Sequence, residues 1–186
     1  MAEDKKKKKG SPVMRVIAGL LLVIAAAVGG VWVYGSSQPE MHTSKGSETI
    51  AAEVSDVFAL QADVPSQTQW RSDLKEVKNW EPGKDGKASW KELWKDGRNE
   101  FKLEVLEFEK NKRLKLKIDD ENKMFYGTWT YEFEEVEGGT KVTITENGGI
   151  PNPFFRGMYN LMNASDKTLK AHLADLKAEA EKKAAK

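Results

Sequence analysis

Four runs of alternating apolar and polar residues dominate the second half of the chain, at residues 101–105, 114–118, 129–133 and 142–146. Every second side chain in each run is apolar, which predicts β-strands with one covered face and one solvent-exposed face. Short sequences rich in Gly, Asp and Asn separate the runs, as in an antiparallel meander. Around residues 105–108 the alternation shifts by one position, which predicts a β-bulge.

A helical pattern follows the last strand. Its apolar residues recur at spacings of three and four and form one stripe: Phe154, Met158, Leu161, Met162, Leu169, His172, Leu173 and Leu176. Asn152 is a suitable N-cap, with Pro153 at the first helical position. Residues 51–62 and 66–70 predict short helical segments before the meander. The predicted order is therefore a strand, two short helices, six strands and one long helix.

Residues 16–34 (VIAGLLLVIAAAVGGVWVY) contain no charged side chain. At about 1.5 Å rise per residue, this length nearly matches a hydrocarbon core of about 30 Å, so we predict a transmembrane helix. Basic residues 5–9 precede it, and Trp32 and Tyr34 lie at its other end. The positive-inside rule then places the N-terminus in the cytoplasm and the following domain outside, across an inner or cytoplasmic membrane.

Two other interpretations of this segment compete. A buried core helix can be equally apolar, although a lysine run at one end and aromatic rings at the other are unusual for one. A signal peptide cleaved after residues 25–27 (AAA) is the stronger alternative. The apolar stretch continues through Val33, however, which favours a retained anchor.

Composition narrows the functional classes. The chain of 186 residues is 39% hydrophobic and 32% charged, with a net charge of +1, which is typical of a globular protein and gives no case for nucleic-acid binding. It has no cysteine and only two histidines, His42 and His172, neither of them in a recognisable motif. We therefore predict no metal site and no cofactor.

Four segments in this order resemble one known family. They are residues 47–58 (SETIAAEVSDVF), 63–70 (DVPSQTQW), 127–133 (GTWTYEF) and 153–158 (PFFRGM). They are similar to the first strand and helix, the second helix, the sixth strand and the start of the long helix of the START-like (SRPBCC) superfamily, in its bacterial polyketide cyclase/dehydrase and lipid-transport branch. The resemblance covers residues 41–177.

The resemblance implies an α+β helix-grip fold, in which a curled antiparallel sheet wraps around the long C-terminal helix and encloses a cavity for lipids, sterols, polyketides or aromatic compounds. It carries no shared catalytic set onto these positions. The predicted organisation is a basic cytoplasmic tail, a transmembrane helix, a linker, a START-like domain and a charged helical tail, at residues 1–15, 16–34, 35–40, 41–178 and 179–186.

The candidate ligand-binding residues are Trp90, Trp94, Trp129, Tyr131, Glu146, Met158 and Met162. The rings and methionines are either plain core or the wall of an apolar cavity. Glu146 continues the alternation of its strand, so it should point to the covered side. It could act there as a general base or contact a ligand head group, or it could be a rim residue that is either solvated or paired with Arg156. His172 is expected to be a satisfied, partly buried histidine rather than a catalytic one.

These features favour a membrane-anchored, extracytoplasmic domain that binds or carries a hydrophobic small molecule or lipid. The alternatives are a protein-interaction module with a filled core, so that a protein partner stays open, and an enzyme of cyclase or dehydratase type. The volume of the cavity distinguishes the module from the other two.

Overall fold

The computed structural model describes residues 11–83, 87–95, 97, 100–120 and 124–186. The elements follow in the order α1 (Pro12–Ser37), β1 (Met41–Ile50), α2 (Val54–Ala62), the 3-10 helix η1 (Val64–Gln69), β2 (Leu74–Glu81), β3 (Ser89–Trp94), β4 (Glu100–Glu109), β5 (Arg113–Asp120), β6 (Tyr126–Val136), β7 (Gly139–Gly149), α3 (Pro153–Leu161) and α4 (Ala164–Ala184). The sequences rich in Gly, Asp and Asn at residues 83–86, 95–98 and 119–122, where turns are expected, lie partly outside the described residues.

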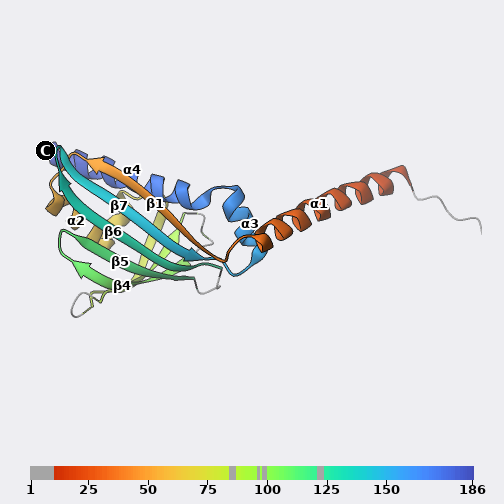
Figure 1. Cartoon of the computed structure of the whole chain (residues 1–186), viewed down its shortest axis with the longest axis horizontal. Coiled ribbons are helices and arrows are strands. Elements are labelled where there is room, and N and C mark those ends of the chain that lie inside the picture. The colour runs from red at the N-terminus through yellow and green to blue at the C-terminus, as the bar shows by residue number, and fades with distance from the viewer. Residues whose placement is uncertain (1–10, 84–86, 96, 98–99, 121–123) are drawn as a thin grey trace, which may run out of the picture.

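All seven strands form one antiparallel sheet in the order β1-β7-β6-β5-β4-β3-β2. The sheet curls around α4, and α2 lies at the end away from α1 (Figure 1). The register of β4 against β5 shifts between Val105 and Glu107, which confirms the bulge predicted from the sequence. The α+β helix-grip fold expected from the sequence is confirmed.

Alternation along the strands produces the core. The inward residues include Leu103 on β4, Leu114, Leu116 and Ile118 on β5, Trp129, Tyr131 and Phe133 on β6, and Val142 and Ile144 on β7. Helix α4 covers them with Leu169, Leu173, Leu176 and Ala180, all buried. Because this face is buried and the other is wet, a slip of one residue would reverse every strand, so the pattern fixes the register.

The C-terminal helical region differs from the prediction of one long helix. It is broken at Asn163, whose φ of 50° and ψ of 48° place it in the left-handed region. Asparagine tolerates this conformation better than most residues. The break ends α3 at Leu161 and changes direction before α4 begins, so Met158, Leu161 and Met162 do not share the buried stripe of Leu169 and Leu173.

Helix α1 extends beyond the predicted residues 16–34 at both ends. Ser11 caps its start by accepting a hydrogen bond from the Met14 amide, and the helix continues through residues 35–37 of the expected linker. It is long and apolar enough to cross a bilayer, with a mean hydropathy of 2.6. A membrane anchor and a signal sequence share these properties. The helix projects from one end of the domain, where it meets α3 (Figure 1).

His172 joins α4 to α2 inside the core. Its Nε2 lies 2.9 Å from the side-chain oxygen of Gln61, and its ring packs against Trp70, Trp129 and Tyr131. Burial, followed by the charge of Arg71, lowers the pKa of His172 to about 3. The histidine is thus fully buried rather than partly buried as expected.

This buried, neutral histidine predicts a loss of stability in acid. The unfolded chain takes up the proton near pH 6.5, about the usual histidine pKa, while the folded protein resists it down to pH about 3. The free energy of unfolding should therefore fall as the pH decreases through this window. In His172→Gln the fall should be shallower, so the stability advantage of the wild type should shrink from pH 7 to pH 4. Urea unfolding at several pH values measures this, and parallel curves would contradict it.

Candidate functional site

Five strands, β3 to β7, begin or end side by side at the end of the sheet nearest α1. The register pairs Phe101 with Asp120, Asp119 with Tyr126, and Tyr126 with Gly149, so that β4 and β6 begin where β5 and β7 end. Trp94 closes β3 beside them, with its ring 5.0 Å from that of Phe101. Side chains far apart in sequence therefore converge at this end.

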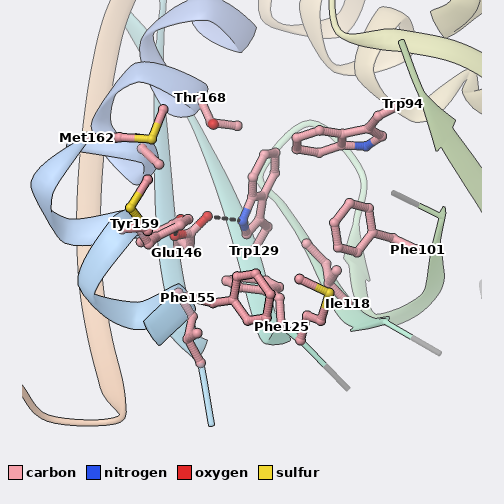
Figure 2. A pocket seen from close by; sticks show the side chains of 14 residues that line it. Trp94, Phe101, Ile118, Phe125, Trp129, Glu146, Phe155, Tyr159, Met162 and Thr168 are labelled. Atoms are coloured by element: carbon pink, nitrogen blue, oxygen red, sulfur yellow. Dashed lines mark hydrogen bonds between the residues drawn. The ribbon is translucent and has the colours of Figure 1, made fainter. Parts of the chain in front are cut away.

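A cavity of about 330 Å³ lies between these strand ends and the junction of α3 with α4. Figure 2 shows its wall, which is formed by Trp94, Phe101, Ile118, Met124, Phe125, Trp129, Glu146, Ile150, Phe155, Met158, Tyr159, Met162, Ala164 and Thr168. Most of these side chains are apolar or aromatic, and a few polar groups lie among them. Small-molecule sites typically have this composition and measure about 300–1,000 Å³.

Among the described residues of this wall, Glu146 is the only one with a charged side chain. It accepts hydrogen bonds from Trp129 Nε1 at 2.7 Å, Ser165 Oγ at 2.6 Å and Tyr159 Oη at 2.9 Å. His42 Nε2 lies 2.8 Å from the same carboxylate. The partners come from β6, α4, α3 and β1, so one side chain of β7 joins four other elements.

Burial of Glu146 raises the pKa of its carboxyl, but the hydrogen bonds from His42, Ser165, Tyr159 and Trp129 outweigh this effect and hold the pKa below its usual range. The group is therefore ionised at neutral pH. Burial and the nearby charge of Glu146 raise the pKa of the Tyr159 hydroxyl, which keeps its proton and remains a donor. This polar cluster has a fixed arrangement of charge and donors.

Comparison with known families identifies this architecture. The chain matches the family described as polyketide cyclase / dehydrase and lipid transport over residues 41–181. It belongs to this family. A search of curated protein sequences finds no significant match.

Solved structures of the same superfamily share the fold at low sequence identity. The Zhui aromatase/cyclase from Streptomyces sp. R1128 superposes with a TM-score of 0.68 at 12% identity, covering 77% of this chain and 96% of that one. A START superfamily protein from Mycobacterium smegmatis gives 0.61 at 14% identity, covering 77% and 99%.

The di-domain ARO/CYC StfQ of the steffimycin pathway gives a TM-score of 0.66 at 12% identity over 78% of this chain, which spans only 52% of that protein. This chain likewise spans only 59% of the length of a second di-domain ARO/CYC, BexL of the BE-7585A pathway. At these identities the likeness establishes the fold alone.

Within this family member, the structure brings together five of the seven candidate ligand-binding residues. Trp94, Trp129, Glu146, Met158 and Met162 all contribute to the cavity wall. These five residues come from three strands of the sheet and from the region where α3 meets α4.

Trp90 and Tyr131 lie elsewhere. Trp90 is buried against Trp80 and donates from Nε1 to Glu92 at 3.0 Å, away from the cavity. Tyr131 is buried deeper and faces a separate void of about 20 Å³. Each lies on the same strand face as a residue that lines the cavity. Because the sheet curls, however, neither of them contacts the cavity.

An ion pair inside the barrel-like sheet was not predicted. Arg71 Nη1 lies 2.8 Å from Glu92 Oε1, and the guanidinium also binds Asp73 at 2.9 Å and Gln67 at 2.9 Å. Burial lowers the pKa of Arg71, but Glu92 and Asp73 outweigh it and raise that pKa above its usual value. The sequence signal was Glu92 on the inward face between Trp90 and Trp94, since a buried carboxylate requires a partner.

The suggested pairing of Glu146 with Arg156 is wrong. Arg156 instead donates from Nε to the Gly35 carbonyl at 2.8 Å and from Nη1 to the Ile150 carbonyl at 2.6 Å. Its backbone lies on α3, which precedes the break at Asn163 and packs against the end of α1. The partners that Glu146 does have, His42, Tyr159 and Ser165, were missed because they converge only through the tertiary fold.

Glu146→Gln tests the strength of this cluster. The amide keeps the shape of the side chain but cannot accept from every donor, and an unsatisfied buried donor costs about 1–3 kcal/mol. The folded pKa of Glu146 lies below the usual value of about 4.3, so the wild-type advantage should be complete at neutral pH and vanish as the pH falls below that value. Chemical denaturation measures the difference.

Glu135→Gln, near the C-terminal end of β6, is the matched control, because its side chain is exposed to solvent. It should change the unfolding free energy by less than about 0.5 kcal/mol. Equal effects of the two substitutions would show that the cluster contributes nothing.

Proposed function

We propose that this protein is a membrane-anchored, extracytoplasmic carrier or binder of an uncharged, largely apolar small molecule, which the cavity beside Glu146 holds. The observation that supports this most directly is the cavity itself, because its wall is apolar over most of its area and contains a single oriented polar cluster. A protein-interaction module with a filled core would have no such space.

The wall favours a neutral ligand with a hydrogen-bond donor. Among the described side chains that form it, none carries a positive charge and one, Glu146, is ionised at neutral pH. A fatty acid or another anion would bring a second negative charge into a region of low dielectric, where the described lining side chains supply no compensating cation. An alcohol or amide can instead donate to the carboxylate while its apolar part contacts Trp94, Phe101 and Phe155 (Figure 2).

The same cluster favours binding over general-base chemistry. A catalytic base works best with a pKa near the working pH, whereas hydrogen bonds hold the pKa of Glu146 below its ordinary value. An enzyme of cyclase or dehydratase type therefore finds less support in this geometry than a carrier does.

The proposed location rests on α1 and the charges before it. Basic residues 5–9 precede a helix of high hydropathy, and Trp32 and Tyr34 lie near its other end. By the positive-inside rule, these charges favour a domain outside the cytoplasm. We propose a retained single-pass anchor rather than a signal sequence cleaved after residues 25–27, because the helix continues without interruption through Ser37.

A reporter fusion tests this orientation. Alkaline phosphatase fused after Lys186 should be active, and a cytoplasmic-only reporter at the same position should be silent. Intact mass of the membrane-extracted protein should include residues 1–27. The opposite reporter pattern would reject the orientation, and a mature protein that starts at Val28 would reject the anchor.

Filling the cavity tests the binding function. Ala164 lies in the wall, so Ala164→Phe should fill the space and abolish binding of the fluorescent probe N-phenylnaphthylamine. Energy transfer to the probe from Trp94 and Trp129 measures this binding. At a hundredfold excess over Kd this probe should stabilise the wild type by about 2.7 kcal/mol and the variant hardly at all. The unliganded variant should lose little stability, whereas overpacking a filled core costs about 1–3 kcal/mol.

Ala171→Phe, on the exposed face of the same helix, is the control and should leave probe binding unchanged. Native mass spectrometry of the full chain extracted from its membrane should show a co-purifying neutral lipid. A strongly destabilised Ala164→Phe variant, combined with a wild type that no probe or lipid stabilises, would reject the function. A co-purifying fatty acid would reject the proposed ligand class.

A further inference from the structure

Helix α3 presents an apolar surface to solvent. The exposed fractions of its side chains and of the next residue are 41% for Phe155, 37% for Met158, 60% for Leu161 and 55% for Met162. The only charged residue of α3 is Arg156, and its guanidinium is turned inward onto the carbonyls of Gly35 and Ile150. An apolar patch of this kind, free of charge, marks a surface that something covers.

The position of α3 is fixed by direct contact with the end of α1. A Cβ atom added to Gly157 would lie 2.5 Å from the Val31 carbonyl oxygen, and one added to Gly35 would overlap the Pro153 carbonyl oxygen. The two helices therefore touch backbone to backbone, and Arg156 closes the contact with its 2.8 Å hydrogen bond to Gly35. Small residues allow this close approach.

This contact sets the depth of α3 relative to a bilayer. Val31 and Gly35 flank Trp32 and Tyr34, the aromatic residues near the C-terminal end of the apolar helix. Such rings reside at the level of the lipid head groups. Since α3 crosses α1 at the same residues, its apolar face lies at that level too.

The exposed face and the cavity share residues. Phe155, Met158 and Met162 are exposed on the α3 surface and also line the cavity, so this surface forms one side of its mouth. Figure 1 shows α3 between α1 and the end of the sheet. The residues that line the cavity lie at this same end. The mouth and the anchor are therefore on the same side of the domain.

We propose that the bilayer surface covers α3, so that the cavity opens directly onto the lipid and loads its ligand from the membrane. This inference rests on the anchor and the cavity function proposed above. The occupant is the lipid surface rather than another protein, because the patch is continuous with the membrane-spanning helix and holds no exposed charge. Amphipathic helices of this type lie at the head-group boundary.

Single-cysteine labelling tests the proposal, since the natural chain contains no cysteine. The full chain is reconstituted in vesicles of phosphatidylethanolamine and phosphatidylglycerol, with a fluorescent label on Leu161→Cys, Glu137→Cys or Leu22→Cys. Spin-labelled lipid with a shallow nitroxide should quench the label at position 161, and aqueous iodide should quench it poorly. Position 137, in the turn at the far end of β6, should show the reverse, and position 22 should be inaccessible to iodide.

Two α1 variants separate the helix contact from a general effect on the anchor. Gly35→Leu should break the α1–α3 contact and raise iodide quenching at position 161 severalfold, whereas Gly30→Leu should not, because a Cβ there meets nothing within 4 Å. Arg156→Gln should shift quenching in the same direction as Gly35→Leu. Circular dichroism must show the same folded domain in each variant.

The outcomes separate the two proposals. Iodide quenching at position 161 as strong as at position 137 overturns the membrane contact, even when the cavity binds N-phenylnaphthylamine in detergent. Lipid quenching at position 161 supports the contact, and a simultaneous failure of probe binding then rejects only the cavity function. Loss of probe loading from vesicles in Gly35→Leu, with detergent binding intact, supports loading from the membrane.

Discussion

The hydrogen-bonded carboxylate of Glu146 is the interaction on which the rest of this architecture depends. It joins β7 to β1, β6, α3 and α4 through His42, Trp129, Tyr159 and Ser165. A buried charge is costly unless donors surround it, so the cluster is stable only when all these elements are in place. It therefore holds the helices at a fixed distance from the strand ends and keeps a space between them.

The break at Asn163 gives this space its shape. A continuous helix would carry Met158 and Met162 along the line of Leu169 and Leu173, away from the mouth. The left-handed residue instead turns α3 across the end of the sheet, where it meets α1. One backbone conformation thus connects the cavity wall, the exposed apolar face and the anchor.

Much of the fold was predictable because its causes are local. Alternation fixed the inward faces of the strands, and the phase shift near Val105 located the bulge. The family resemblance then predicted that the sheet curls and that it wraps around the C-terminal helix. Five of the candidate residues line the cavity because they lie at or near strand ends, on α3, or directly after α3, whereas Trp90 and Tyr131 share their alternation but not their position along the curl.

The sequence by itself determined which side chains face inward, where an apolar helix precedes the domain, and that Glu146 belongs to the covered side. Each follows from a period of two or four residues or from a run of one kind of residue. Only the tertiary structure decided the partners of Glu146, the pairing of Arg71 with Glu92, and the approach of Gly157 to Val31. His42 and Glu146 are 104 positions apart, and no local pattern encodes a contact over that separation. The curl of the sheet and the turn at Asn163 bring such groups together, since their geometry sums small rotations over many residues.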